Sequence, residues 1–148
     1  MKIPVRWLIW FMVIPLSSAL AGEPIALPKV GTAQAAVKEI ERMLESFSAG
    51  NLAAVEKIIV PDMIGRQELI DAMRQSLDRH KQMRITLLSP QMAQAGDVVV
   101  VQARWEKHAL LMPSASAIKR QGRTDFFMKK SASGWQLVGQ SGDNIFAP

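Results

Sequence analysis

The sequence contains no cysteine and no tyrosine, and it has only two histidines among its 148 residues. The absence of cysteine excludes a disulfide framework and a lipoprotein attachment site, so the fold must be stabilised by its hydrophobic core. The histidines, His80 and His108, fall in different predicted elements and have no carboxylate at the spacing of metal ligands. The sequence also lacks a phosphate-binding loop and a dinucleotide fingerprint. We therefore expect neither a metal site nor a cofactor.

The first 21 residues have the pattern of a signal peptide. Lys2 and Arg6 give a positive start, residues 7–16 form a short apolar run, and Ala19-Leu20-Ala21 fits the cleavage rule for small residues. We predict cleavage after Ala21, with a periplasmic or secreted mature chain. The apolar run is shorter than the ~20 residues of a membrane span, so an uncleaved signal segment is the one route to membrane attachment.

The charge balance does not suggest a nucleic-acid partner. The net charge of +5 includes Lys2 and Arg6, so +3 remains once residues 1–21 are removed. The densest basic group, Lys119, Arg120 and Arg123, lacks the interleaved aromatic residues of a nucleic-acid-binding platform. We interpret it as a solvated strand edge, where basic side chains discourage aggregation between sheets.

The first half of the mature chain has helical periodicity. Residues 22–31 carry two prolines and two glycines without a period, and they predict an extended lead-in. Apolar residues at helical spacing then predict three helices, from Thr32 to Gly50, from Leu52 to Ile59, and from Gly65 to about Lys81. Methionines in these stripes could line a flexible pocket, although methionine at helical spacing usually fills a core.

From Arg84 onward the hydrophobic period changes to two. The alternation predicts a strand after Arg84, a long strand from Val98 to Leu111, and a closing hairpin from Lys119 to Asp143. Pro90 cannot donate a ladder hydrogen bond and predicts a bulge or an edge position. Helices followed by strands indicate an α+β fold, in which three N-terminal helices pack on a four-stranded antiparallel sheet.

Side-chain alternation assigns the strand residues to two faces of this sheet. The inward face comprises Val99, Val101, Ala103, Trp105, Thr124, Phe126, Met128, Trp135, Leu137 and Gly139. The outer face carries Val98, Val100, Phe127 and Val138 among Arg104, Glu106, Arg123, Asp125 and Gln136. A sheet face exposed to water is normally polar, so we predict that a partner chain covers these apolar residues. A strand bulge would exchange the two faces beyond it.

Several short segments resemble, in their order and spacing, the nuclear transport factor 2-like superfamily, which also includes SnoaL-like and ketosteroid isomerase-like proteins. They are Ser48-Ala49-Gly50-Asn51-Leu52, the stretch Gly65–Met73, Arg104-Trp105, Gly122-Arg123, Phe126-Phe127, and Gly134-Trp135 with Leu137. The resemblance covers residues 32–148. It implies a cone, in which a strongly curved sheet wraps around the first helix and leaves an apolar cavity. It also implies a homodimer formed through the outer face of the sheet, at Val98, Val100, Phe127 and Val138.

The catalytic sets of this superfamily find no match in the sequence. The ketosteroid isomerase and scytalone dehydratase types use tyrosine, which is absent. The limonene epoxide hydrolase type needs an Asp-Arg-Asp set inside the cavity, whereas Arg104 and Asp125 are predicted on the outer face, where they could form a cross-strand salt bridge. His108 and Glu106, two residues apart on one strand, could act as base and acid but are more often a surface contact.

These inferences predict an exported, non-enzymatic domain that binds a small apolar ligand in the cone. The residues expected to line the cavity are Leu44, Phe47, Val101, Ala103, Trp105, Phe126, Met128, Trp135 and Leu137. A dimeric assembly module of the cell envelope is the alternative. An enzyme with a site drawn from His108, Glu106, Arg104 and Asp125 is a third hypothesis; it requires a polar group that faces the cavity, and we predict none on the inward face.

Overall fold

A computed structural model describes residues 30–148 of the chain. The predicted signal peptide and the predicted lead-in up to residue 29 lie outside the described residues. Three helices open the described part, α1 (Val30–Ser48), α2 (Leu52–Ile58) and α3 (Arg66–Arg79). Their order agrees with the prediction, and α1 begins two residues before the expected start at Thr32. Among residues 30–148, no helix is both long enough and apolar enough to cross a membrane.

Local backbone chemistry explains where the helices end. Gly50 follows α1 with φ of 78°, a left-handed conformation that glycine adopts without steric cost. Asn51 then caps α2, because its side-chain oxygen accepts a hydrogen bond from the Ala54 amide at 3.2 Å. Helix α3 ends at Arg79, since His80 has an extended backbone with φ of −118° and ψ of 138°. The predicted end near Lys81 is therefore two residues too late.

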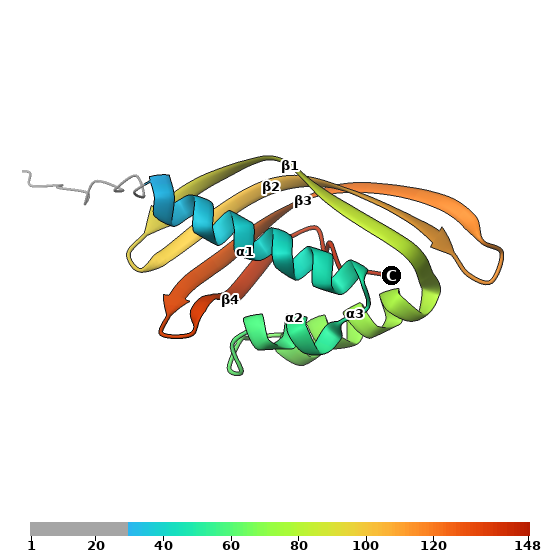
Figure 1. The fold of residues 1–148 in the computed structure, drawn as a ribbon, viewed down its shortest axis with the longest axis horizontal. Coiled ribbons are helices and arrows are strands. Elements are labelled where there is room, and N and C mark those ends of the chain that lie inside the picture. Colours follow the sequence, from blue (N-terminus) through green and yellow to red (C-terminus); the bar gives the residue numbers. More distant parts are fainter. Residues whose placement is uncertain (1–29) are drawn as a thin grey trace, which may run out of the picture.

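Four antiparallel strands form one sheet in the order β1 (His80–Ala95), β2 (Val98–Leu111), β3 (Ser116–Ser131) and β4 (Gly134–Gly142). This confirms the predicted α+β meander. Strands β1 and β3 each begin a few residues before their predicted starts, so the sheet is longer than expected. The sheet curves around α1, and all three helices lie on its concave side (Figure 1). The cone-like architecture implied by the resemblance is thereby confirmed.

Bulges in the edge strands shift the register of the sheet. In β1 the pairing slips between Leu88 and Gln91, around the proline that predicted a bulge. In β4 the pairing passes from Leu137, opposite Met128, directly to Gly139, opposite Phe127, so Val138 is an extra residue.

The β4 bulge reverses one predicted face assignment. Residues directly opposite each other on neighbouring strands share a face, so Gly139 shares the outer face with Phe127. A Cβ added at Gly139 would lie 3.5 Å from the Phe127 ring. The predicted inward position of Gly139 is therefore wrong. Gln140, opposite Phe126, has the inward position instead.

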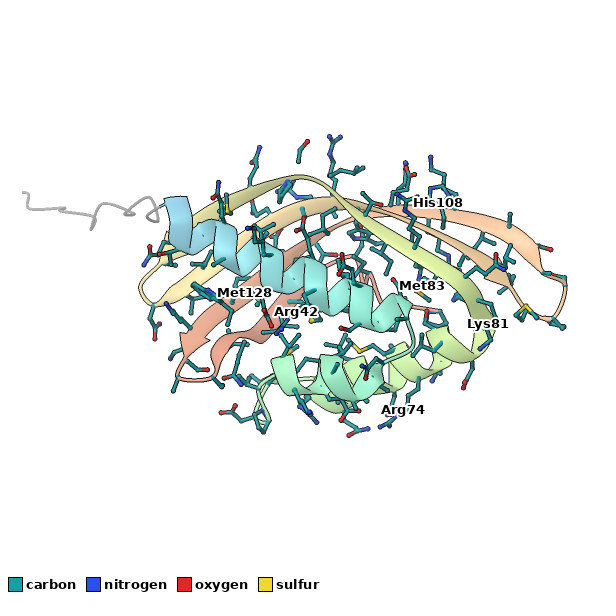
Figure 2. All side chains as sticks on the ribbon, in the orientation of Figure 1. Arg42, Arg74, Lys81, Met83, His108 and Met128 are labelled. Atoms are coloured by element: carbon teal, nitrogen blue, oxygen red, sulfur yellow. The ribbon has the colours of Figure 1, made fainter. Side chains whose placement is uncertain are left out.

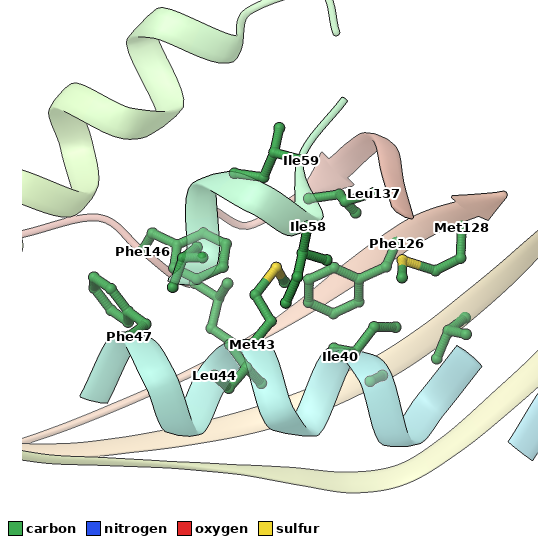
Figure 3. Packing of buried hydrophobic residues seen from close by; sticks show 14 of the residues in the cluster. Ile40, Met43, Leu44, Phe47, Ile58, Ile59, Phe126, Met128, Leu137 and Phe146 are labelled. Atoms are coloured by element: carbon green, nitrogen blue, oxygen red, sulfur yellow. The ribbon is translucent and has the colours of Figure 1, made fainter. Parts of the chain in front are cut away.

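The core lies between α1 and the concave face of the sheet. Ile40, Met43, Leu44 and Phe47 of α1 pack toward Phe126, Met128 and Leu137 of the sheet (Figure 3). The chain after β4 returns beneath the sheet as a short segment, residues 144–148, which we call the C-terminal strap. Its Ile145 and Phe146 are fully buried, and the Phe146 ring meets Phe47 edge to face at 5.1 Å and 87°. The strap therefore closes the core at the end of α1 that carries Phe47.

Candidate functional site

The residues predicted to line a cavity all belong to the interior. Phe47, Leu44, Val101, Ala103, Trp105, Phe126, Met128 and Leu137 are buried, whereas Trp135 is half-buried and packs against the same cluster. Their inward direction confirms the predicted parity of β2, β3 and the first half of β4. In the close-up of the core, side chains from α1, the sheet and the strap fill much of the space between them (Figure 3). Hollows adjoin this core at its edges, and Trp135 lines one of them, of about 400 Å³.

A groove of about 670 Å³ runs between α1 and the edge strand β1. Its floor is apolar and consists of Leu44, Met83, Ile85 and Leu87. Met83 lies between the end of α1 and β1 (Figure 2). The α1 wall carries the polar side chains of Glu41, Glu45 and Ser48. Arg84 and Thr86 border the groove through β1, but they lie opposite His108 and Glu106 and share the outer face with them. Of the predicted cavity residues, Leu44 is the one that contributes to this groove.

The apolar floor of the groove is formed by β1, which is an edge strand paired with β2. Ile85 and Leu87 point toward α1, since they lie opposite the inward-facing Lys107 and Trp105 of β2. Both remain half-buried, because α1 does not cover the edge of the sheet fully. A second hollow of about 300 Å³ shares Ser48, Ala49 and Met83 with the groove and reaches His80. Together they form one depression along the α1–β1 edge, which we call the α1–β1 groove.

A polar cluster lies inside the fold. Lys107 has only 1% of its surface exposed, and its Nζ donates a hydrogen bond to the Ala147 carbonyl of the strap at 2.6 Å. The Ser76 hydroxyl donates to the same carbonyl at 3.4 Å and lies 3.2 Å from Nδ1 of His80. Ser76 and His80 are also buried. The expectation that the inward face carries no polar group is therefore wrong.

The sequence did contain the signal for this cluster. Lys107 continues the inward series of Val99, Val101, Ala103 and Trp105 by one more alternation. A lysine at that position reads as the solvated end of a strand, because lysine is rarely fully buried. His80 reads as a cation at the end of α3, whereas the start of β1 at His80 directs its side chain into the fold.

The hydrogen bonds of His80 define its tautomer. Its Nδ1 lies 3.0 Å from the Ser76 carbonyl oxygen, which can only accept, so Nδ1 carries the proton. Nε2 is therefore an acceptor, and it is buried without a hydrogen-bond partner among the described residues. Burial lowers the pKa of His80 below its usual value, and the positive charges of Lys107, Arg120 and Arg79 act in the same direction. The histidine is therefore neutral at physiological pH.

Lys107 has a positively charged neighbour. Lys107 and Arg120 are directly opposite in the pairing of β2 with β3, and so share the concave face. Burial lowers the pKa of Lys107 to about 8, and the Arg120 charge contributes to this shift. Arg120 itself donates a short hydrogen bond to a main-chain oxygen of Pro148, the last residue of the sequence. The two basic side chains thus bind main-chain oxygens of the last two residues of the strap.

Next to this cluster, the sheet fixes the start of the strap. The Trp105 indole donates to the Thr124 hydroxyl at 2.9 Å, and Thr124 donates to the Asp143 carbonyl at 2.5 Å. The Asp143 carboxylate accepts a hydrogen bond from the Arg123 amide at 2.8 Å. Gly122 faces the Trp105 ring, where an added Cβ would lie only 2.5 Å from a ring carbon. Glycine at this position lets the indole lie flat on the strand.

The residues of the third functional hypothesis lie on the outer face. His108 points away from α1 (Figure 2) and makes a short contact with the Glu106 carboxylate. Hydrogen bonds from His108, then Lys119 and Gln121, lower the pKa of Glu106 to about 2. Glu106 is therefore ionised at physiological pH, and the pair belongs to a surface network away from the α1–β1 groove.

The expected pairing of Arg104 with Asp125 does not form. A direct cross-strand salt bridge would need Arg104 opposite Asp125. Instead, Arg104 lies opposite Arg123, and Asp125 lies opposite Gln102. Asp125 instead lies 4.0 Å from Arg123 and accepts a hydrogen bond from Gln102 at 3.4 Å. Within residues 30–148, no group of three or more histidine, aspartate or glutamate side chains could hold a metal ion.

The outer face has an apolar row at its centre. Ala93, Val100, Phe127 and Gly139 are consecutive partners across the four strands, and Val98 lies in the next row. Val98, Val100 and Phe127 are half-buried. The fourth residue of the predicted interface, Val138, is the extra residue of the β4 bulge and is half-buried as well.

No family model and no curated protein matches the sequence. The fold, however, is shared with many solved structures. A protein of Novosphingobium aromaticivorans proposed to be an aromatic ring hydroxylase superposes with a TM-score of 0.66 at 13% identity, over 81% of this chain and 99% of that one. A nuclear transport factor 2-like superfamily protein of Salmonella enterica serovar Typhimurium gives 0.64 at 14% identity, over 77% and 91% of the two chains. A second Novosphingobium aromaticivorans protein, nuclear transport factor 2-like with a cystatin-like fold, gives 0.59 at 14% identity, over 76% and 81%. The chain therefore has the nuclear transport factor 2-like fold.

Proposed function

We propose that this chain is an exported, non-enzymatic domain that binds a small apolar ligand in the α1–β1 groove. The observation that carries the proposal is the half-buried floor of the groove, where Ile85 and Leu87 face a hollow of about 670 Å³. Ligand sites are typically concave and mostly apolar, with a few polar groups that fix orientation. Glu41 and Glu45 on the α1 wall would supply those polar groups. The signal-peptide pattern of residues 1–21 supports export.

The position of the ionisable side chains favours binding over catalysis. The pair of His108 and Glu106 lies on the outer face of the sheet, where it cannot reach a ligand in the groove. Lys107 and Ser76 bind the strap, and Nδ1 of His80 donates to a backbone carbonyl. General acid–base catalysis requires a side chain free to exchange a proton with the ligand.

The proposal is tested by comparing Leu87→Lys with Leu88→Lys. Leu87 lies on the groove floor, whereas Leu88 is the next residue and is 36% exposed on the other face of β1. An ammonium group in the apolar floor should weaken binding of Nile red by ~10-fold or more, because the lysine must be desolvated to admit the dye. The Leu88→Lys variant should bind the dye as the unmodified protein does.

Native mass spectrometry of the exported protein provides the second measurement. The unmodified protein and Leu88→Lys should carry an added mass that disappears on denaturation, and Leu87→Lys should lose it. Equal dye affinity in the two variants, or an added mass retained by Leu87→Lys, would place the ligand outside the groove.

The apolar row of the outer face favours a second candidate function, that of a dimeric assembly module. Phe127→Asp should convert a dimer to a folded monomer, because a carboxylate at the centre of an apolar interface is left without a partner. The control is Gln75→Asp, which introduces the same charge at an exposed residue of α3, away from the outer face of the sheet. Sedimentation velocity measures the mass of each. A Phe127→Asp variant that remains dimeric would show that the outer face is not the interface.

A further inference from the structure

The α1 wall of the α1–β1 groove carries two acidic side chains in an unfavourable position. Glu41 and Glu45 both line the groove, four residues apart on one face of the helix, where like charges destabilise each other. Glu45 also lies in the last turn of α1, where the helix dipole favours positive charge, yet that turn contains no basic residue. Local rules of this kind are broken most often at functional sites.

The carboxylates of the groove differ from the other acidic residue in this part of α1. Glu39 forms a salt bridge with Arg42 and does not line the groove. Glu41 and Glu45 are exposed, and among residues 30–148 neither of them forms a salt bridge. Both carboxylates are therefore free to bind a cation that enters the groove.

The basic residues near the groove lie on another face or bind elsewhere. Arg84 shares the outer face of the sheet with His108, which it lies opposite. Lys81 donates a hydrogen bond to a main-chain carbonyl of α3 at 3.1 Å. Lys107 is buried and donates to the C-terminal strap at 2.6 Å. Asp78 adds a third acidic side chain where the second hollow extends the groove, so the charge that faces a ligand is negative.

We propose that the ligand of the α1–β1 groove is an amphipathic cation, an alkyl or aryl amine whose ammonium group binds Glu41 and Glu45. This inference rests on the proposed function, since it requires that the groove binds an apolar ligand. The hydrocarbon part lies on the floor, against the half-buried Ile85 and Leu87.

The spacing of the two glutamates suits a single ammonium group. Residues four apart on a helix have Cβ atoms about 5–6 Å apart, so both carboxylates can reach one nitrogen. An ammonium group offers N–H donors, and its hydrogen bonds to carboxylates are charge-assisted. A fatty acid would instead place its own carboxylate beside Glu41 and Glu45, which makes the groove selective against it.

The test compares three ligands that share one hydrocarbon chain: octylamine hydrochloride, 1-octanol and sodium octanoate. Isothermal titration calorimetry of the exported protein, at pH 7 and constant low ionic strength, measures each affinity. Octylamine should bind ~10-fold more tightly than octanol, because two exposed carboxylates attract its charge, and octanoate should bind more weakly than octanol. The advantage of octylamine should decrease as salt is added, whereas a purely apolar contact has no such dependence.

The double variant Glu41→Gln with Glu45→Gln should bind octylamine and octanol with equal affinity, since it keeps the shape of the wall and removes its charge. Glu39→Gln is the matched control, because it makes the same change on the same helix outside the groove. It should retain the ~10-fold preference for octylamine.

The outcomes separate this inference from the proposed function. Equal affinity of the unmodified protein for octylamine and octanol would overturn the inference, and so would the same preference in the double variant and in Glu39→Gln. If octanol still binds and Leu87→Lys weakens it, the groove remains the site of an apolar ligand. An absence of saturable binding for all three ligands would overturn the groove and the cationic ligand together.

Discussion

Replacement of Phe146 by alanine should lower the free energy of unfolding by about 3–5 kcal/mol, the range seen when a buried phenylalanine is truncated. Phe146 has no exposed surface, and its ring packs edge to face on Phe47 at 5.1 Å. The substitution would leave a cavity between α1 and the strap. It would also loosen the strap, because Ile145 would remain as the sole fully buried side chain among residues 144–148.

Urea unfolding followed by tryptophan fluorescence measures this loss. Ile145→Val is the matched control, since it removes a single methyl group from the neighbouring buried side chain and should cost about 1 kcal/mol. A loss below about 1 kcal/mol for Phe146→Ala would mean that the strap does not contribute to the core and that the cone is closed by other residues.

The strands show how far a sequence pattern determines structure. Val99, Val101, Ala103 and Trp105 face inward as predicted, because a regular strand alternates strictly and the core accepts only one of the two faces. The helical stripe of α1 is predictable for the same reason, since Ile40, Leu44 and Phe47 recur at a fixed spacing. Both patterns are local, so neither depends on knowing which segments meet in space.

The β4 bulge could not be predicted in this way. Trp135, Leu137 and Gly139 continue the alternation without a break in the sequence, yet the register against β3 skips Val138. The skip depends on the partner strand, since it places Gly139 beside Phe127 and turns Gln140 inward. One extra residue moves every later side chain of the strand to the opposite face of the sheet, and the alternation of a single strand does not show which residue is extra.

The candidate sites depend on contacts between distant segments. The α1–β1 groove combines Leu44 with Ile85 and Leu87, about forty positions apart in the chain, and it exists because α1 leaves the sheet edge uncovered. The strap has no hydrophobic period, so the sequence alone does not predict that Ile145 and Phe146 are buried. They are buried because the strap packs against Phe47 of α1. The position of Lys107 on the inward face was predictable by alternation, whereas the Ala147 carbonyl that accepts its hydrogen bond was not.

The buried Lys107 should make the stability of the protein depend on pH in a direction that can be stated in advance. Its pKa falls from 10.5 in the unfolded chain to about 8 in the folded protein, because burial and Arg120 disfavour the charged form. When a base has a lower pKa in the folded protein, the resulting loss in the free energy of unfolding is greatest at a pH below the folded pKa. The cost disappears as the pH rises through the unfolded pKa, so the free energy of unfolding should increase between about pH 8 and pH 10.5.

The size of the increase follows from the shift, since one pKa unit corresponds to about 1.4 kcal/mol, which gives an upper limit of about 3 kcal/mol. Urea unfolding at a series of pH values measures it, and the difference from Lys107→Met isolates it from the other lysines. The variant should be more stable than the unmodified protein near pH 7, by up to the same ~3 kcal/mol, because an apolar side chain replaces a buried charge.

The control for this measurement is Lys119→Met, which changes an exposed lysine of β3 that pairs with Glu106 at 2.9 Å. It should leave the pH dependence between about pH 8 and pH 10.5 unchanged, because an exposed ion pair contributes little to stability. Parallel stability curves for the unmodified protein and Lys107→Met would show that the lysine is as well solvated in the fold as in the unfolded chain.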